Sequence, residues 1–157
     1  MPTLVANDKE ACSLLLFMSI LAENGTCAGV LKEGVFFDGK YTALRRALIE
    51  HFNVLQVISV PSDQFENTTT KTSIIIFQNN GKTENVVFSE LRINKYTEDS
   101  FEVLDNQLKL IHNQGQIMED NGVEKVYVGE ASYQDIISMK IREKCQYSLN
   151  AKKYQKL

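Results

Sequence analysis

The chain has 157 residues, a length that fits a single domain built around one hydrophobic core. Apolar residues make up 43% of it and charged residues 24%, proportions that are typical of globular proteins and exclude a disordered chain. No apolar run approaches the length of a membrane span, and the first residues lack the pattern of a signal peptide. We therefore expect an intracellular, cytoplasmic protein.

The cysteines and histidines favour neither a metal site nor a catalytic thiol. Cys12, Cys27 and Cys145 are odd in number and widely spaced, which argues against a disulfide framework and a zinc site. Cys12 and Cys27 lie among apolar residues, so we expect buried thiols in a reducing environment. His51 and His112 fall near predicted helix ends, where an imidazolium interacts favourably with the helix dipole.

The net charge of −3 is unevenly distributed along the chain. Residues 140–157 contain six basic side chains and one acidic side chain, a balance of +5, which leaves −8 for the rest. Such a basic end is typical of a solvated tail, and it also suits contact with a phosphate backbone. The charge pattern alone favours the solvated tail, with contact to a phosphate backbone as the alternative.

The first predicted element is a helix over residues 8–23, because its apolar residues follow the spacing of one helix face. Asn7 and Glu10 resemble a capping box at its start, and Asn24-Gly25 is a stop signal at its end. The expected buried face contains Ala11, Leu14, Leu15, Met18, Leu21 and Ala22.

A strand, a loop and a second helix are predicted next. The short apolar run at 26–31 suits a buried strand, and residues 32–39 suit a loop with two glycines. The helix is expected over 40–52, with one apolar side toward the core and its charged residues elsewhere. The apolar side contains Tyr41, Leu44, Leu48 and Phe52, and the charged residues are Arg45, Arg46 and Glu50.

Two β-branched runs, residues 53–60 and 71–78, are typical of strands buried on both faces, as in a parallel sheet. The Asn-Asn-Gly-Lys sequence at 79–82 is a hairpin signal, so we predict that residues 85–90 pair antiparallel with 71–78. These elements predict an α/β fold with a mixed sheet, parallel strands ending in an antiparallel hairpin, and helices packed on it.

The pattern is weaker beyond residue 91. Residues 101–111 fit a helix, residues 123–129 fit a short strand, and Ser132 is a suitable cap for a further helix. The chain also opens on a helix, as though a preceding strand were missing.

Four short motifs follow one another along the chain. VLKEG at residues 30–34 is a strand end, with Lys32 at its centre, and VPS at 60–62 ends the next strand. TKT at 70–72 opens the strand after that, and YSLNAKKY occupies 147–154. Their order and spacing resemble the C-terminal part of the N6-adenine-specific DNA methyltransferase domain in type I restriction-modification methylase subunits. The family usually has proline in the position of Lys32.

The resemblance implies a Rossmann-like methyltransferase fold and transfer of a methyl group from S-adenosylmethionine to an adenine flipped out of double-stranded DNA. Flipping is needed because the N6 amino group cannot be reached inside the duplex. The resemblance covers residues 8–91 and 132–154. It implies that residues 1–91 form the C-terminal half of the catalytic domain, and that 92–157 form a mixed helical and irregular extension toward a missing target-recognition region.

Four residues are candidates for contact with DNA. Phe65 lies in the loop where the family carries an aromatic residue that stacks on the extruded adenine, although a loop aromatic can equally anchor a loop to the core. Lys71 could reach a DNA phosphate, or could simply be a charge at the mouth of the sheet. Lys152 and Lys153 in the basic tail are further candidates.

Two diagnostic elements of the family are absent from the sequence. None of the eight glycines forms a Gly-x-Gly turn after a strand, and Pro2 and Pro61 are the only prolines, so the Asn-Pro-Pro-Tyr motif cannot be present. We therefore expect no catalytic, cofactor-binding or metal-binding residue here and no methyl transfer by the chain alone. The strand at 26–31 would pair with a central strand that this chain lacks, which implies a partner supplying the N-terminal half or another modification subunit.

Three functions remain open at this point. The chain could be a methyltransferase half that works with a partner, a non-catalytic DNA-binding remnant, or an α/β protein unrelated to DNA. The third is disfavoured because a general α/β pattern would not produce both the TKT and the YSLNAKKY motifs.

Overall fold

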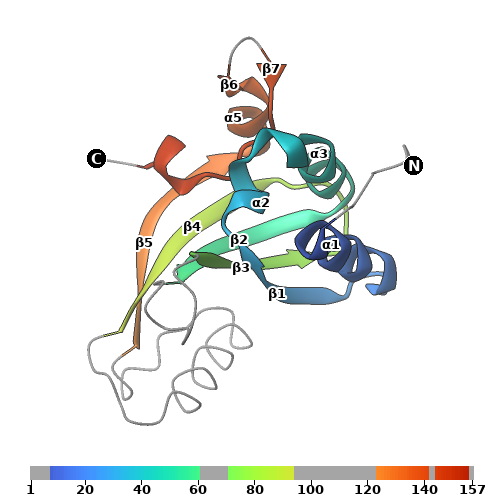
Figure 1. Cartoon of the computed structure of the whole chain (residues 1–157), viewed down its shortest axis with the longest axis horizontal. Helices are drawn as coiled ribbons and strands as arrows, with labels where there is room; N and C mark the ends of the chain where they lie inside the picture. Colours follow the sequence, from blue (N-terminus) through green and yellow to red (C-terminus); the bar gives the residue numbers. More distant parts are fainter. Residues whose placement is uncertain (1–7, 61–70, 94–122, 142–143, 156–157) are drawn as a thin grey trace.

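The computed structural model describes residues 8–60, 71–93, 123–141 and 144–155. They form a five-stranded sheet in the order β1-β3-β2-β4-β5, a separate two-stranded sheet, and several helices (Figure 1). The strands are β1 (Thr26–Lys32), β2 (Asn53–Val60), β3 (Thr72–Gln78), β4 (Asn85–Ile93), β5 (Val123–Ser132), β6 (Lys140–Ile141) and β7 (Lys144–Cys145). The helices are α1 (Lys9–Ile20), α2 (Gly34–Phe37), α3 (Thr42–His51) and α5 (Tyr133–Ser138), with 3-10 turns η1 (Gly39–Tyr41) and η4 (Ala151–Lys153). None of these helices is long and apolar enough to cross a membrane.

The mixed α/β sheet predicted from the sequence is confirmed, with β1, β2 and β4 running in one direction and β3 and β5 in the other. The predicted positions of α1, α3 and the first three strands agree with the structure to within a few residues. Ser132 caps α5 with a reciprocal capping box, as expected. The expected loop at 32–39 instead contains the short helix α2.

The predicted hairpin between residues 71–78 and 85–90 is wrong. β4 lies beside β2 in parallel, and β3 occupies the other side of β2. β3 is paired with β1 on one edge and with β2 on the other, so it has no free edge for β4. Thr83, which is fully buried at the junction of α3 and β2, anchors the connection between β3 and β4. Its N–H donates to the carbonyl of Ile49, while its hydroxyl donates to the Phe52 carbonyl and accepts from the Val54 N–H. These bonds carry the connection across the start of β2, so the next strand pairs on its far side.

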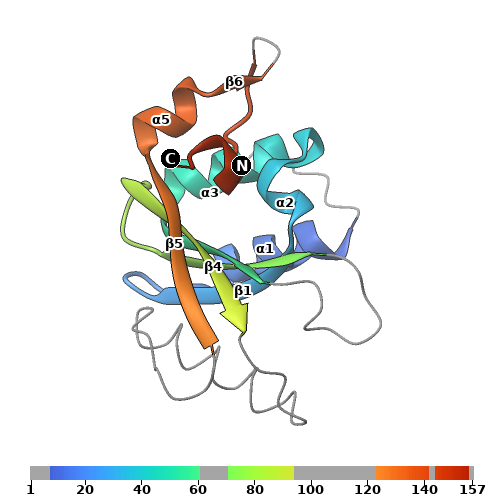
Figure 2. The ribbon, with the colours of Figure 1, turned by 90° about the vertical axis from the view of Figure 1, so that its left-hand side faces the viewer.

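The two faces of the sheet carry separate apolar clusters. On one face, which we call the helix face, strand residues such as Val57, Ile75 and Phe88 pack with α1, α2, α3 and α5. Figure 2 shows α2 and α3 together on this side of the sheet. The second face has its own buried cluster, Ile58, Val60, Ile74, Ile76 and Leu91. Burial on both faces explains why β2 and β3 are continuously apolar.

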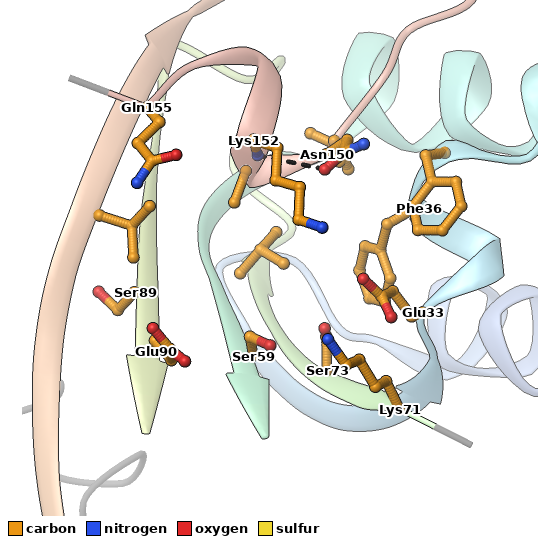
Figure 3. A pocket seen from close by; sticks show the side chains of 15 residues that line it. Glu33, Phe36, Ser59, Lys71, Ser73, Ser89, Glu90, Asn150, Lys152 and Gln155 are labelled. Atoms are coloured by element: carbon orange, nitrogen blue, oxygen red, sulfur yellow. Dashed lines mark hydrogen bonds between the residues drawn. The ribbon is translucent and has the colours of Figure 1, made fainter. Parts of the chain in front are cut away.

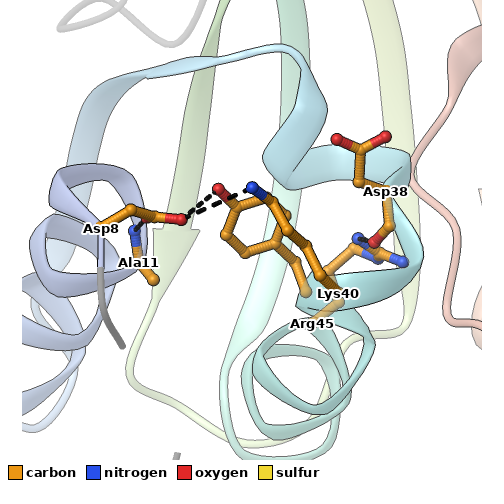
Figure 4. A network of polar contacts seen from close by, with 6 residues as sticks. Asp8, Ala11, Asp38, Lys40 and Arg45 are labelled. Carbon is orange, nitrogen blue, oxygen red and sulfur yellow. Dashed lines mark hydrogen bonds and ion pairs between the residues drawn. The ribbon is translucent and has the colours of Figure 1, made fainter. Parts of the chain in front are cut away.

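The N-cap of helix α1 lies one residue later in the chain than predicted. Asp8, not Asn7, is the N-cap, and its Oδ1 accepts a hydrogen bond of 2.9 Å from the Ala11 N–H. Its Oδ2 accepts one of 2.5 Å from the Tyr41 hydroxyl and lies 3.8 Å from the Lys40 ammonium (Figure 4). The Ala11 and Tyr41 hydrogen bonds lower the pKa of Asp8. One carboxylate thus starts α1 and joins it to the turn before α3.

The surface of α1 is more apolar than expected for an outer helix. Ala11, Leu14 and Met18 are buried as predicted, whereas Leu16 and Ile20 are exposed. The expectation of buried thiols is also wrong for Cys12, which is exposed, while Cys27 is half-buried. Burial raises the pKa of the Cys27 thiol.

The prediction that the Arg45 side chain of α3 points away from the core is wrong, because this side chain is 1% exposed. Nη1 donates to the carbonyls of Val35 at 2.9 Å and Asp38 at 2.7 Å. Nε and Nη2 donate to the Gln146 carbonyl, and Nε also donates to that of Tyr147 at 3.1 Å. Burial lowers the pKa of Arg45 to about 10, against the raising effect of the Asp38 charge, so the guanidinium stays charged at neutral pH.

The C-terminal segment, residues 146–155, lies on the helix face. The Tyr154 ring stacks on Phe88 with centroids 5.3 Å apart, and its hydroxyl donates to the Ser148 carbonyl at 2.7 Å. The Leu149 N–H donates to the Phe36 carbonyl at 2.7 Å. Gly129 on β5 allows close approach, because a Cβ there would lie 2.4 Å from the Tyr154 carbonyl oxygen.

Replacing Arg45 tests whether its fork of donors holds α2 and the C-terminal segment together. We expect Arg45→Ala and Arg45→Lys both to lower the free energy of unfolding by about 3 kcal/mol or more, since an ammonium donates from one atom and leaves several buried carbonyls without a donor. Urea unfolding followed by circular dichroism measures this. Arg46→Lys, on the exposed side of α3, is the matched control and should change stability by less than about 0.5 kcal/mol. An Arg45→Lys variant as stable as the wild type would show that the guanidinium does not hold α2 and the C-terminal segment together.

Two glycine substitutions distinguish a steric clash with backbone atoms from a clash with a side chain that can move. A Cβ at Gly29 would lie 2.6 Å from Cε2 of Phe17, the end of a side chain that can move, whereas a Cβ at Gly129 meets backbone. We expect Gly129→Ala to destabilise the fold by about 1–3 kcal/mol and Gly29→Ala by clearly less. The same urea measurement compares them, and an equal or reversed order would show that the C-terminal segment is not held against β5.

Candidate functional site

A cavity of about 210 Å³ lies on the helix face of the sheet (Figure 3). It is bordered by Glu33, directly after β1, by Ser59 near the end of β2, and by Glu90 in the last part of β4. These three strands run parallel, so their carboxyl ends meet at one edge of the sheet. In open α/β sheets, ligands bind outside the carboxyl ends of the strands.

The floor of the pocket is polar because hydroxyls replace the apolar side chains of the neighbouring core. Val57 and Ile75 are directly paired core residues of β2 and β3. Two residues further along, the paired residues are Ser59 and Ser73. Ser89 of β4 also lines the space. The core of the helix face therefore ends here in a set of hydroxyls that can both donate and accept hydrogen bonds.

The walls come from two segments that are distant in sequence. Phe36 and Phe37 of α2 form an aromatic side, and the C-terminal segment contributes Leu149, Asn150 and Gln155. The Asn150 side chain caps the short turn η4 by accepting from the Lys152 N–H at 3.1 Å. Because Arg45 bonds carbonyls of both segments, the same guanidinium fixes both walls.

Two lysines and two glutamates bring both signs of charge into the pocket. Lys71, immediately before β3, and Lys152, on η4, reach the space from different sides (Figure 3). Glu33 and Glu90 line it as well. In the described part of the chain, no ion pair joins any two of these four groups. The lysines can thus serve a ligand that carries negative charge.

The structure brings together two of the four residues singled out from the sequence. Lys71 and Lys152, 81 positions apart, line one pocket. Lys153 is exposed on η4 and is not part of the lining. Phe65 lies outside the described residues.

Sequence reasoning missed the polar floor and the acidic walls. The serines did carry a signal, since each is a small polar residue inside a run of buried strand residues. Their convergence depends on the strand order, which the sequence pattern placed differently for β4. Glu33 and Glu90 carried no comparable signal, because an acid near a strand end is usually solvated.

The residues present do not fit S-adenosylmethionine. The cavity is smaller than the roughly 300–1,000 Å³ usual for ligands of that size, and no strand in the sequence is followed by a glycine-rich turn. Within the described ranges, no group of three or more His, Cys, Asp or Glu side chains is placed to hold a metal ion.

Comparison with known proteins places these features in a family. The sequence matches the family described as N-6 DNA methylase over residues 2–157. It is 31% identical over 88 residues to the methylase subunit of the type I restriction enzyme MpnII from Mycoplasma pneumoniae. That match covers 55% of this chain and 16% of the relative.

Two solved structures share the fold. The modification subunit of a putative type I restriction enzyme from Vibrio vulnificus YJ016 superposes with a TM-score of 0.65 at 22% identity, covering 95% of this chain and 33% of that one. The methyltransferase subunit of a type I restriction-modification system from Streptococcus thermophilus superposes with a TM-score of 0.54 at 26% identity, covering 84% and 27%.

The chain therefore spans a third or less of the length of these relatives. The family match, in contrast, extends over nearly all of this chain, which goes against an α/β protein unrelated to DNA. The chain belongs to the N-6 DNA methylase family of adenine-specific DNA methyltransferases and corresponds to part of one such enzyme.

Proposed function

We propose that this chain contributes the DNA-contacting part of an adenine-N6 DNA methyltransferase of a restriction-modification system, acting inside the cell together with the remainder of the methylase domain. The substrate is an adenine in double-stranded DNA, and the methyl donor is S-adenosylmethionine, held by the remainder. The observation that carries the proposal is the convergence of Lys71 and Lys152 in one pocket at the carboxyl ends of three parallel strands.

The chemistry of the pocket supports contact with nucleic acid. Ammonium groups bind phosphate oxygens, and these contacts position a protein on DNA without reading its sequence. Lys153, next to Lys152 and exposed, is proposed as an outer phosphate contact. Phe65, between Val60 and Lys71 in the sequence, is proposed as the ring that stacks on the extruded adenine.

The chain alone is expected not to transfer methyl groups, because neither the cofactor turn nor the Asn-Pro-Pro-Tyr motif is present in its sequence. Purified chain is incubated with cofactor labelled in its methyl group and with adenine-containing duplex DNA, and label in the DNA is counted. An intact type I methylase, assayed in parallel, is the positive control. Label above that of a heat-inactivated sample would contradict the assignment of catalysis to the remainder of the domain.

The lysines can be tested by the salt dependence of DNA binding. Lys71→Gln, Lys152→Gln and Lys153→Gln should each weaken binding regardless of sequence, and should each reduce the slope of log affinity against log salt by about 0.9. Fluorescence anisotropy with a labelled duplex measures both quantities. Lys9→Gln, which removes an exposed charge outside the pocket, is the control for net charge. The pocket assignment fails if Lys71→Gln and Lys152→Gln bind DNA as Lys9→Gln does.

A further inference from the structure

Two buried hydroxyls border the pocket described above. Ser73 and Ser89 are 5% and 3% exposed, and both line the cavity. Among the residues that the structure describes, neither hydroxyl has a hydrogen-bond partner. Buried polar groups in proteins are nearly always hydrogen-bonded. These two hydroxyls therefore point to a polar ligand that enters the cavity.

The hydroxyls on the floor form a row across neighbouring strands. The sheet order places β2 between β3 and β4. Ser73 of β3 is paired with Ser59 of β2, and Ser89 of β4 lines the same space. Neighbouring strands lie about 4.8 Å apart, so a row across three strands extends over roughly 10 Å. A row of this length offers hydrogen bonds to more than one polar group of a ligand.

Two charges of each sign lie around this row (Figure 3). Glu33 follows β1 and Lys71 precedes β3, and the Glu33 N–H donates to the Lys71 carbonyl at 3.0 Å. Glu90 of β4 borders the cavity from the other side of β2. Lys152 approaches from η4, across the cavity from the sheet. Charges of both signs therefore reach the hydroxyl row from different directions.

The charges of the side chains that line the cavity sum to zero. An anionic ligand inside it would be attracted by two ammonium groups and repelled by two carboxylates, and a cation would meet the reverse. A zwitterion can place its negative group by the lysines and its positive group by the glutamates. Hydrogen bonds that involve ionised groups are also roughly twice as strong as neutral ones. Charge complementarity therefore favours a zwitterionic ligand.

The remaining wall of the cavity is apolar. Phe36 and Phe37 of α2 lie on one side, and Val128 and Leu149 line the cavity as well. These side chains favour an apolar group beside the zwitterion, since its burial removes apolar surface from water. The volume of about 210 Å³ is below the roughly 300–1,000 Å³ of sites for drug-sized ligands, which limits the occupant to a small molecule. A small zwitterion with an apolar side chain is an α-amino acid such as leucine or methionine.

We propose that the pocket binds a free α-amino acid with an apolar side chain of about the size of leucine. Lys71 and Lys152 hold its carboxylate, and Glu33 and Glu90 hold its ammonium group. The floor hydroxyls donate to the carboxylate, and the apolar wall contacts the side chain. The inference goes beyond the proposed function, because the ligand is a free small molecule that binds without DNA.

Isothermal titration calorimetry of the purified chain with L-leucine tests the class of ligand. We expect saturable binding with a Kd of about 1 mM or lower. Isocaproate lacks the ammonium group of leucine and isoamylamine lacks its carboxylate, so each should bind at least tenfold more weakly. No saturation by L-leucine, or equal binding by either analogue, would overturn the proposal.

Two further probes test the size of the ligand. Glycine carries the same zwitterion without an apolar side chain, and S-adenosylmethionine carries it on a molecule that is too large for the cavity. We expect both to bind at least tenfold more weakly than L-leucine and L-methionine. Equal binding of glycine would show that the apolar wall is not used. Tighter binding of S-adenosylmethionine than of L-methionine would show that the occupant is not a free amino acid, and either result would overturn the proposal.

Variants that remove single charges test the residues. Lys152 and Glu90 are exposed, so their replacement should leave the fold intact. We expect Lys152→Gln and Glu90→Gln each to weaken L-leucine binding at least tenfold. Lys9→Gln and Glu84→Gln remove exposed charges outside the lining, and these matched controls should bind as wild type. Equal binding by the pocket variants and their controls would overturn the proposal.

Replacement of the floor hydroxyls distinguishes a binding role from a structural one. In Ser73→Ala and Ser89→Ala, the lost hydroxyl has no partner in the described part of the chain, so the urea midpoint of unfolding should not fall. L-leucine binding should weaken several-fold in each, and wild-type binding by both variants would overturn the proposal. DNA binding that Lys71→Gln weakens, in a chain that binds no amino acid, would leave the proposed function intact and overturn this inference alone.

Discussion

One buried guanidinium connects segments of this chain that lie far apart in sequence, since Arg45 and Tyr147 are 102 residues apart. Among the described residues, Arg45 has no carboxylate hydrogen-bonded to it, and it donates instead to backbone carbonyls before and after it in the chain. A buried charge is tolerated only when its hydrogen-bond donors have acceptors. The guanidinium therefore fixes the positions of four accepting carbonyls, those of Val35, Asp38, Gln146 and Tyr147. This side chain joins α2 to the C-terminal segment, and the Leu149–Phe36 hydrogen bond and the stacking of Tyr154 on Phe88 add to the same connection.

The pocket is a consequence of that arrangement. Its floor belongs to the sheet, but its two walls belong to the segments that Arg45 holds, and Tyr154 fixes the second wall by stacking on Phe88. The space therefore combines a rigid hydroxyl floor, an aromatic side and opposed charges. Walls that are held in place favour binding of any ligand, because a preorganised surface loses less conformational entropy on binding.

The described residues cover the two edge strands of the sheet differently, and each only at one point. At β5, the C-terminal segment makes a bridge between Gly129 and Gln155. At β1, the backbone of three residues faces outward beside the apolar side of α1. Proteins usually protect edge strands with charges, bulges or covering segments. Among the residues that the structure describes, Glu10 provides such protection at Lys32 of β1.

The sequence by itself determined the elements, because their signals are local. The spacing of Leu14 and Met18, the β-branched run at 53–60, the cap at Ser132 and the ordered methylase motifs all act over a few residues. Only the tertiary structure decided that Arg45 is buried, that β4 pairs with the far side of β2 beside the buried Thr83, and that Lys71 and Lys152 share a pocket. Each of these depends on partners 29 or more residues away, as between Val54 and Thr83 or between Arg45 and Gln146. Periodicity reports which side of an element is apolar, but a polar group is buried only where distant backbone supplies its hydrogen bonds, and no local pattern contains that information.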